Sequence, residues 1–430
     1  MSSVQRGLSA ALVVLLVVAI LLSAYNTVQL AQLERQVKSV SSSVGSLNST
    51  IQGVSSRVSS LNSTIQSSIA NVNRLSEMAS ALGSELSELN ATLSGRIASL
   101  GSQLTQLESE VRFPVTIVDA LNRTVVIPSM PMRIVTLDPA ATEIALAVGA
   151  GGQLVAVDND SVLYLPPPFN DTVHEMVANG SLKVISSTYS SPDIEQIMAL
   201  SPDLVIGTAG WGYNNYIAST LASYGIPVLL LPSSESLEDV YRAVIMVGEA
   251  TGHVNNAVKL VESMSAQITA VERSLENVSY VNVTVILWIN PTYVAGGGTF
   301  INDMMTLAGG VNVFQNLSGW PVISSEDLLQ ANPSVIILVS NGGLFNASSL
   351  YQWLNSTIGP AYVNIAAIKY GRVYVIGGWY ESAMSEPAVL TPMAVKLLAI
   401  ILHPQAFNLT SVPQLITPST LSPSFLANQG

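Results

Sequence analysis

Few side chains in this 430-residue sequence have the types and spacing that catalysis requires. The three histidines, His174, His253 and His403, are far apart in the sequence, so packed or surface positions suit them better than one shared metal. Asp138 and Glu143 are near enough to form a carboxylate pair for acid–base chemistry, but roles in a turn and a helix cap explain them more simply. The sequence therefore predicts a protein that is not an enzyme and that has no resident metal or cofactor.

Sites built on other motifs are excluded in the same way. The chain has no cysteine, which removes disulfides, thiolate metal ligands, thiol nucleophiles and a lipidated cysteine anchor. It has no G-x-S-x-G motif, and the glycine run at 296–298 lacks the lysine and the spacing of a phosphate-binding loop. That glycine run is expected to form a turn.

Aromatic residues in expected loops give the clearest indication of binding chemistry. Flat rings bury a large area at low entropic cost, so they suit a large planar ligand. The alternative, that several of them only pack in the core, stays open. The candidate ligand-binding residues are Tyr164, Tyr189, Trp211, Tyr293, Trp320, Trp379 and Tyr380.

The elements that must position these rings form two similar halves around one helical stretch. Residues 232–277 carry apolar side chains at helical spacing, and Gly252 is expected to break or kink this helix. Short apolar strands alternate with helices on both sides of it. We predict an α/β fold with two lobes, a bridging helix and a ligand cleft, and one continuous α/β domain is the alternative. The predicted parts are an N-terminal lobe at 113–232, the bridging helix at 233–277, a C-terminal lobe at 278–404 and a flexible tail at 405–430.

The first 29 residues contain an apolar run, from Gly7 to Ala24, that is long enough to span a bilayer. We expect a single-pass transmembrane anchor in the cell membrane, with the globular part extracellular or periplasmic. Two alternatives stay open: a cleaved secretory signal, and a pilin-type signal that is cut after Gly7 and leaves the apolar helix in place.

Residues 30–112 carry two mainly apolar columns at every seventh position, from Leu33 to Leu89 and from Val37 to Leu93. β-Branched residues in one column and leucine in the other favour a parallel two-stranded coiled coil, so the expected partner is a second copy of this chain. A trimer is the alternative. A helix of this length would form a stalk of about 120 Å.

Charge and glycosylation motifs indicate an exported protein that does not bind nucleic acid. The net charge is −12, and from residue 113 onward there are 9 basic and 22 acidic residues, whereas nucleic-acid binding needs basic patches. Many N-x-S/T motifs follow the apolar run, which suggests a glycoprotein at the cell surface. These motifs begin at Asn48, Asn62, Asn90, Asn122, Asn159, Asn170, Asn179, Asn277, Asn282, Asn316, Asn346, Asn355 and Asn408.

A series of stretches, in order and in spacing, resembles the substrate-binding proteins of ABC importers that take up metal chelates, namely vitamin B12, haem and ferric siderophores. The resemblance covers about residues 116–403 and leaves out the apolar run and the heptad segment. It implies the two-lobed periplasmic-binding-protein fold. The stretches are Arg133–Gly149, Ser191–Ile206, Gly225–Val228, Trp288–Val294, Gly298–Asp303, Ala308–Phe314, Gly319–Leu329, Asn332–Ile337, Gly371–Tyr374 and Gly378–Tyr380.

The resemblance also implies partners. A protein of this family delivers its ligand to a membrane permease with its ATPase, and one exposed glutamate on each lobe docks on the permease. The positions that match these glutamates are Glu195 and Glu326. A long stalk would hold the lobes far from a permease, so a surface receptor or a structural assembly subunit that reuses the fold is the alternative function.

The resemblance is closest to the vitamin B12-binding member. Tyr189, Trp320 and the pair Trp379–Tyr380 fall near the positions where that member contacts its ligand. We therefore expect a transported corrinoid-like ligand such as cobalamin, with haem or a ferric siderophore as the alternative.

Overall fold

The computed structural model describes residues 113–233 and 235–428, together with residues 73–75, 78, 80–83, 85 and 89. The predicted anchor at 1–29 and most of the predicted stalk at 30–112 lie outside these described residues. The few described residues before residue 90 are helical. No helix in the part of the chain that the structure describes is long and apolar enough to cross a bilayer.

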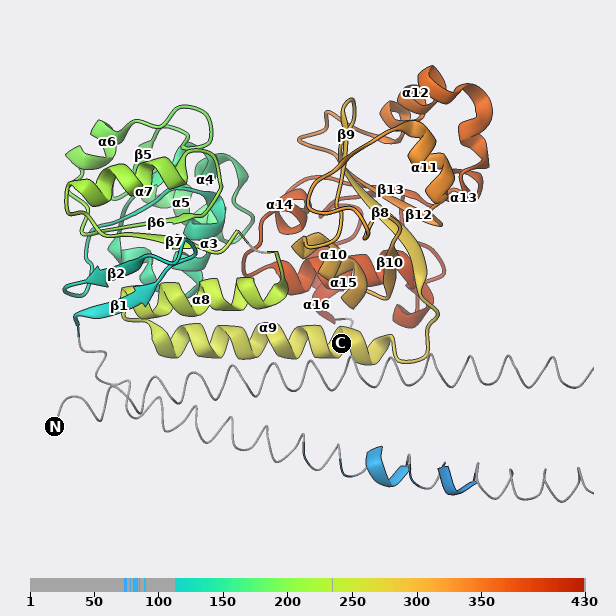
Figure 1. Ribbon diagram of the computed structural model, residues 1–430, viewed down its shortest axis with the longest axis horizontal. Coiled ribbons are helices and arrows are strands. Elements are labelled where there is room, and N and C mark those ends of the chain that lie inside the picture. The colour runs from blue at the N-terminus through green and yellow to red at the C-terminus, as the bar shows by residue number, and fades with distance from the viewer. Residues whose placement is uncertain are drawn as a thin grey trace, which may run out of the picture. The chain divides into compact units, whose positions relative to one another are not determined.

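Two compact units make up the chain, residues 1–99 and residues 100–430. The second unit holds two α/β lobes above a pair of long helices (Figure 1). Each lobe has a sheet with apolar cores on both faces. The predicted two-lobed α/β fold is confirmed.

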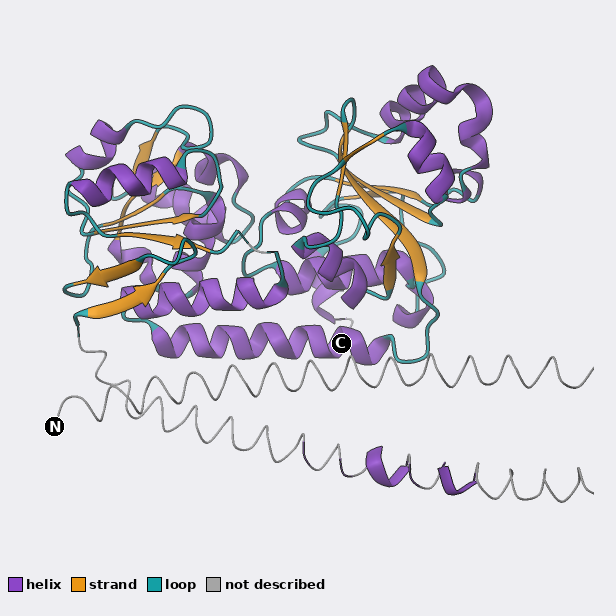
Figure 2. Cartoon of the chain, in the orientation of Figure 1, coloured by secondary structure: helices purple, strands orange, loops and turns teal. Residues whose placement is uncertain are grey.

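The N-terminal lobe is a parallel sheet with the strand order β5-β4-β3-β6-β7 (Figure 2). Its strands are buried on both faces, which is why they appear in the sequence as continuous apolar runs. A separate hairpin, β1–β2, precedes the sheet. The elements are β1 (Val115–Val118), β2 (Thr124–Ile127), β3 (Ile134–Thr136), α3 (Pro139–Ala147), η2 (Ala150–Gln153), β4 (Leu154–Asp158), α4 (Asn159–Tyr164), α5 (Phe169–Ala178), β5 (Lys183–Ile185), α6 (Ile194–Ala199), β6 (Leu204–Thr208), α7 (Asn214–Ser223) and β7 (Val228–Leu231).

The C-terminal lobe has a mixed sheet with the strand order β11-β9-β8-β12-β13-β14, and β10 also pairs with β8. The β8, β12 and β13 strands are parallel, whereas β9 and β11 are antiparallel to their neighbours. The elements are β8 (Val281–Trp288), β9 (Thr292–Val294), α10 (Phe300–Leu307), β10 (Gly310–Asn312), β11 (Val322–Ile323), α11 (Ser325–Ala331), β12 (Val335–Val339), α12 (Ala347–Ile358), η3 (Gly359–Asn364), α13 (Ala366–Lys369), β13 (Val373–Ile376), α14 (Tyr380–Ser385), α15 (Thr391–Leu402), η4 (Pro404–Phe407), β14 (Leu415–Ile416) and α16 (Pro423–Asn428).

Two helices side by side, rather than one, connect the lobes (Figure 1). Helix α8 (Leu237–Thr251) ends at Gly252, whose left-handed φ of 80° stops the helix, and α9 (Val254–Ser274) then runs back. The predicted break at Gly252 is confirmed. The predicted single bridge is corrected to a helical hairpin, because the chain reverses its direction at the break.

Both helices of this hairpin contact both lobes. In α8, Leu237 belongs to the C-terminal core, whereas Val244 belongs to the N-terminal core. In α9 the order is reversed, with Ala257 in the N-terminal core and Ile268 in the C-terminal core. The apolar residues at helical spacing in 232–277 therefore pack partly in the N-terminal core and partly in the C-terminal core.

A third crossing joins the lobes near the end of the chain. Ala388 and Val389, in the loop between α14 and α15, are buried in the core of the N-terminal lobe. This loop adds a connection that the sequence pattern does not reveal.

The C-terminal segment is folded as far as it is described, to residue 428, which corrects the predicted flexible tail at 405–430 over that range. Strand β14 pairs with β13, and Ile416, Leu421 and Leu426 are buried in the core of the C-terminal lobe. These apolar residues are widely spaced among Pro, Ser and Thr, so the local composition hides their tertiary contacts.

Candidate functional site

The loops after strands β3 and β6 meet at the carboxyl edge of the N-terminal sheet, where the side chain of Asp138 holds them together. Asp138 caps helix α3, as predicted, and its Oδ1 accepts a hydrogen bond from Ala141 N at 2.8 Å. The same carboxylate accepts from Thr208 N at 2.6 Å, Thr208 Oγ1 at 3.0 Å and Asn214 Nδ2 at 2.8 Å. A side chain that is 1% exposed and accepts four hydrogen bonds has a structural role.

A chain of hydroxyl groups extends this polar network to the end of β4. Thr142 Oγ1 lies 2.8 Å from Ser161 Oγ, which donates to Asp158 Oδ1 at 2.5 Å. Burial raises the pKa of Asp158 to about 7, and burial also raises the pKa of Asp138 although its hydrogen bonds act in the opposite direction. The carboxyl edge of this sheet is thus a buried, connected polar network.

Tyr189 and Trp211 are neighbours on the loops after β5 and β6. Their ring centroids lie 5.2 Å apart at an interplanar angle of 52°. A Cβ on Gly212 would lie 2.4 Å from the Cα of Tyr189, so a glycine is required for the two loops to touch. Tyr189 is 59% exposed. The Nε1 of Trp211 is buried and has no hydrogen-bond partner among the described residues.

In the C-terminal lobe, Trp320 is 44% exposed and its ring packs edge-on against Phe300, with the centroids 6.1 Å apart. Its loop is held by the backbone of the glycine run, because Gly296 N donates to Gly319 O at 2.8 Å and Gly297 N donates to Leu317 O at 2.7 Å. The predicted turn at 296–298 is corrected here, since Gly297 forms a bridge with residue 318.

Two further rings lie on neighbouring strands of the same lobe. Tyr293 on β9 is 37% exposed. Trp288, at the end of β8, is 40% exposed and stands edge-on to Phe345, with the centroids 4.8 Å apart. Trp288 was missing from the candidate residues, although it begins one of the stretches that carry the family resemblance.

The structure places the other three candidates differently. The ring of Tyr164 is exposed at the end of α4, and its backbone oxygen accepts a hydrogen bond from Ser382 Oγ of the C-terminal lobe at 2.6 Å. Trp379 is half-buried against the C-terminal core. Tyr380 is fully buried and its hydroxyl donates to Leu421 O at 2.7 Å, so it has a core role in place of the predicted ligand contact.

Acidic side chains lie where the two lobes touch. Glu143 of α3 is 2% exposed, and its Oε1 accepts a hydrogen bond from Leu390 N at 3.1 Å. Burial raises the pKa of Glu143 to about 8, and burial together with nearby carboxylates, including Asp138, raises the pKa of Glu386 to about 8. The contact depends on residues 247 positions apart, so the helix pattern around Glu143 could not show it.

Glu195 and Glu326 occupy the same kind of position on the two lobes. Both are exposed in the first turn of a short helix, α6 or α11, whose N-cap is Asp193 or Ser324. Both helices lie on the side of their lobe that faces away from α8 and α9 (Figure 1). An acid in a first turn also interacts favourably with the helix dipole.

The three histidines lie on separate elements. His174 contacts Val162 O, His253 contacts the side chain of Gln153, and His403 contacts Gly309 O. Among the described residues, no group of three or more His, Cys, Asp or Glu side chains is placed to hold a metal ion.

Comparison with known proteins identifies the family. The sequence profile of the periplasmic binding protein family matches residues 134–379. An ABC transporter substrate-binding lipoprotein of Bacillus subtilis is 29% identical over 65% of this chain and 84% of its own length. A cobalamin-binding protein of Halobacterium salinarum is 26% identical over 66% of this chain and 73% of its own.

A solved structure shares the fold. The periplasmic haem-binding protein of Roseiflexus superposes with a TM-score of 0.52 and 23% identity, over 64% of this chain and 98% of that one. The profile match covers more than half of the 430 residues. The chain therefore belongs to the periplasmic binding protein family, whose role is solute binding and not catalysis.

Proposed function

We propose that this chain is a membrane-anchored, extracytoplasmic substrate-binding protein that delivers a corrinoid-like or other metal-chelate ligand to an ABC importer. The observation that carries the proposal is the presence of exposed aromatic rings on both lobes, Tyr189, which packs against the half-buried Trp211, on one and Trp320 on the other. The cobalamin-binding relative supports a corrinoid as the first choice. Haem or a ferric siderophore is the alternative ligand.

The ligand would lie between the lobes, against rings from both. Tyr293 and Trp288 would add exposed ring surface to the C-terminal side of the site. Tyr164 and Trp379 are proposed contacts at the margin. Flat rings suit a broad macrocycle, because they bury much area with little loss of side-chain freedom.

The carboxyl groups at the carboxyl edge favour a neutral ligand. Asp138, Asp158, Glu143 and Glu386 lie close enough to influence one another's protonation. Burial raises the pKa of Glu143 and Glu386 to about 8, so both are mainly protonated at neutral pH, and a charged ligand buried beside uncharged groups loses its hydration without gaining an ionic partner. This argues against a strongly anionic siderophore.

Glu195 and Glu326 would dock on basic pockets of the permease, one from each lobe. Both are exposed, Glu195 on α6 and Glu326 on α11, and each helix lies on the side of its lobe that faces away from α8 and α9. A permease that binds both lobes at once would recognise the distance between the two glutamates.

Anchor and stalk complete the proposal. Among the described helical residues, Leu75, Leu82 and Leu89 are spaced by seven and are each more than half exposed. Such a stripe is the seam of a coiled coil, so a second copy of the chain would cover it. The same stalk favours the second candidate function, a surface receptor or assembly subunit, because a permease would lie far below the lobes.

The double variant Glu195→Ala with Glu326→Ala tests the importer role. In proteoliposomes that carry the cognate permease and ATPase, we expect at least a tenfold loss of permease binding and uptake, with ligand affinity unchanged. Glu262→Ala, an exposed acid on α9, is the matched control. Intact permease binding by the double variant would refute the docking role and favour the receptor or assembly function.

A further inference from the structure

The β1–β2 hairpin presents an uncharged, β-branched face to solvent. Val118 and Val126 are 59% and 50% exposed, and Thr116 and Thr124 lie beside them on the same face. The opposite face, with Ile117 and Val125, is buried in the N-terminal core. An exposed two-stranded sheet without charges at its edges is suited to contact another surface.

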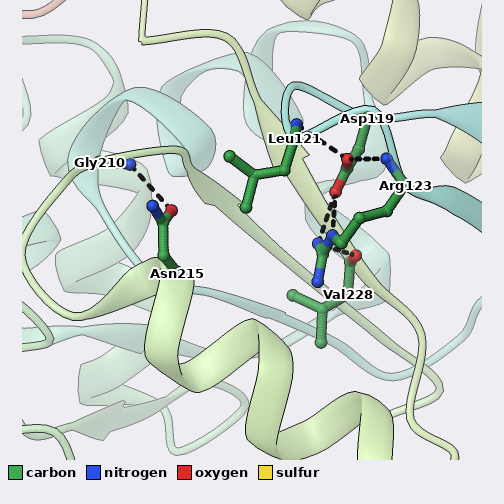
Figure 3. A network of polar contacts seen from close by, with 6 residues as sticks. All are labelled: Asp119, Leu121, Arg123, Gly210, Asn215 and Val228. Carbon is green, nitrogen blue, oxygen red and sulfur yellow. Dashed lines mark hydrogen bonds and ion pairs between the residues drawn. The ribbon is translucent and has the colours of Figure 1, made fainter.

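The charges in this segment are neutralised within it. Asp119 is 1% exposed and accepts hydrogen bonds from Arg123 Nε at 2.9 Å and Nη2 at 2.5 Å (Figure 3). Arg123 Nη2 also donates to Val228 O of the edge strand β7 at 3.1 Å. Ala120 N donates to Leu230 O at 2.9 Å. Hydrogen bonds to β7 therefore fasten the hairpin to the N-terminal lobe.

The position of the hairpin in the sequence indicates what covers this face. Apolar residues at 100, 104, 107 and 111 continue the heptad spacing of the predicted stalk, and β1 begins at Val115. Four residues span at most about 14 Å. Paired helices lie about 10 Å apart. Two copies joined by their stalks would thus bring the starts of their hairpins within about 40 Å of each other.

Such tethering makes a small contact effective. A hairpin face is much smaller than the roughly 1,200 Å² of a free-standing specific interface, so it would not hold two molecules together alone. A tethered face meets its partner at an effective concentration in the millimolar range, at which a small apolar contact is enough.

We propose that the outer face of the β1–β2 hairpin, formed by Thr116, Val118, Thr124 and Val126, is a contact surface for the same hairpin of a second copy of this chain. The inference rests on the proposed pairing of the stalk. Valine and threonine side chains from the two faces would interdigitate without burying a charge. The contact would fix the orientation of the N-terminal lobes of the two copies relative to each other.

Single-cysteine variants of the full-length chain test this proposal, because the natural chain has no cysteine. Thr116→Cys and Val126→Cys report on the hairpin, Leu75→Cys reports on the stalk, and Tyr370→Cys, 70% exposed on the C-terminal lobe, is the control. Each variant is treated with a short bis-maleimide reagent, and the yield of covalent dimer is measured on a denaturing gel. We expect dimer from the hairpin and stalk variants, with at least a tenfold lower yield from Tyr370→Cys.

Two other outcomes would overturn the proposal and are distinguishable. Dimer from Leu75→Cys without dimer from the hairpin variants would refute the hairpin contact and leave the stalk pairing intact. No dimer from any variant would refute the stalk pairing as well. As a second measurement, Val118→Asp added to Thr116→Cys should lower the hairpin yield at least tenfold, and added to Leu75→Cys it should leave the stalk yield unchanged. An unchanged hairpin yield would contradict the proposal.

Discussion

In the N-terminal lobe the loop that carries Trp211 is fixed by side chains as well as by a close backbone approach at Gly212, whereas in the C-terminal lobe backbone contacts fix the loop that carries Trp320. In the N-terminal lobe, the carboxylate of Asp138 accepts hydrogen bonds from groups on two loops. In the C-terminal lobe, Gly297 leaves room for a backbone oxygen of the neighbouring loop. Hydrogen bonds made by a side chain are lost when that side chain is removed. A close approach of two backbone segments is lost when an added atom pushes them apart. Loss of a side chain should therefore damage the loop contact of the N-terminal lobe, whereas an added atom should damage the loop contact of either lobe, at Gly212 or at Gly297.

The largest expected effect is that of Asp138→Ala. The substitution leaves Thr208 N and Asn214 Nδ2 buried without an acceptor, which should lower the free energy of unfolding by about 3–4 kcal/mol. Urea denaturation of the full-length chain measures this loss. Asp138→Asn keeps one acceptor oxygen and should lose less. An unchanged urea midpoint for Asp138→Ala would contradict this role of Asp138.

Gly297→Ala adds one carbon to the C-terminal lobe. Its Cβ would lie 2.2 Å from Gln315 O, so the two backbones must separate, at about 2–3 kcal/mol. We expect a lower unfolding midpoint and altered fluorescence of Trp320. Gly152→Ala, where a Cβ would meet nothing within 4 Å, is the control and should change stability by less than about 0.5 kcal/mol. Equal effects of the two variants would show that the close approach is unimportant.

The contact between the lobes should depend on pH. Burial raises the pKa of Glu143 to about 8, above its ordinary value of 4.5. Between these values the folded protein keeps a proton that the unfolded chain releases, so stability is greatest at low pH and falls as the pH rises toward 8. In this pH range the free energy of unfolding falls by about 1.4 kcal/mol per pH unit for each such proton.

Glu143→Gln tests this pH dependence. The variant cannot titrate at this position, so unfolding midpoints measured from pH 5 to pH 8 should fall less steeply than in the natural chain. Glu386 and Asp158, whose pKa values burial also raises, retain part of the slope. If the unfolding midpoint of the variant fell as steeply with pH as that of the natural chain, Glu143 would be excluded as a titrating group.

The smallest effect is expected for Tyr380→Phe. It removes one buried hydrogen bond, to Leu421 O, and should lower the free energy of unfolding by about 1 kcal/mol. Ligand affinity should stay the same, because the ring is fully buried. A tenfold loss of ligand affinity in this variant would show that Tyr380 contributes to ligand binding.

Local patterns in the sequence were sufficient for much of the fold. Buried strands were visible as apolar runs, Asp138 as a helix cap, and Gly252 as a helix end. Each of these features depends on residues that are close together in the chain. The helical hairpin of α8 and α9 was missed because a glycine marks a break without giving the direction that follows.

The parts that sequence could not predict depend on distant contacts. Val389 enters the core of the other lobe, and Ile416 adds a strand from a segment whose composition resembles a loop. Tyr380 follows Trp379 directly, yet one ring is fully buried and the other half-buried. Exposure of an aromatic ring is decided by tertiary packing, which residue type alone does not show.

Calorimetric titration of the full-length chain with cobalamin, haem and a ferric siderophore tests the central claim most directly. We predict binding of cobalamin that weakens about tenfold in both Trp211→Ala and Trp320→Ala, since each ring supplies about 1–2 kcal/mol of contact. Tyr224→Ala, which truncates a ring that is 62% exposed at the end of α7, should bind like the parent. Failure to bind any of the three ligands, or binding that both tryptophan variants leave unchanged, would contradict a ligand site formed by aromatic rings of the two lobes.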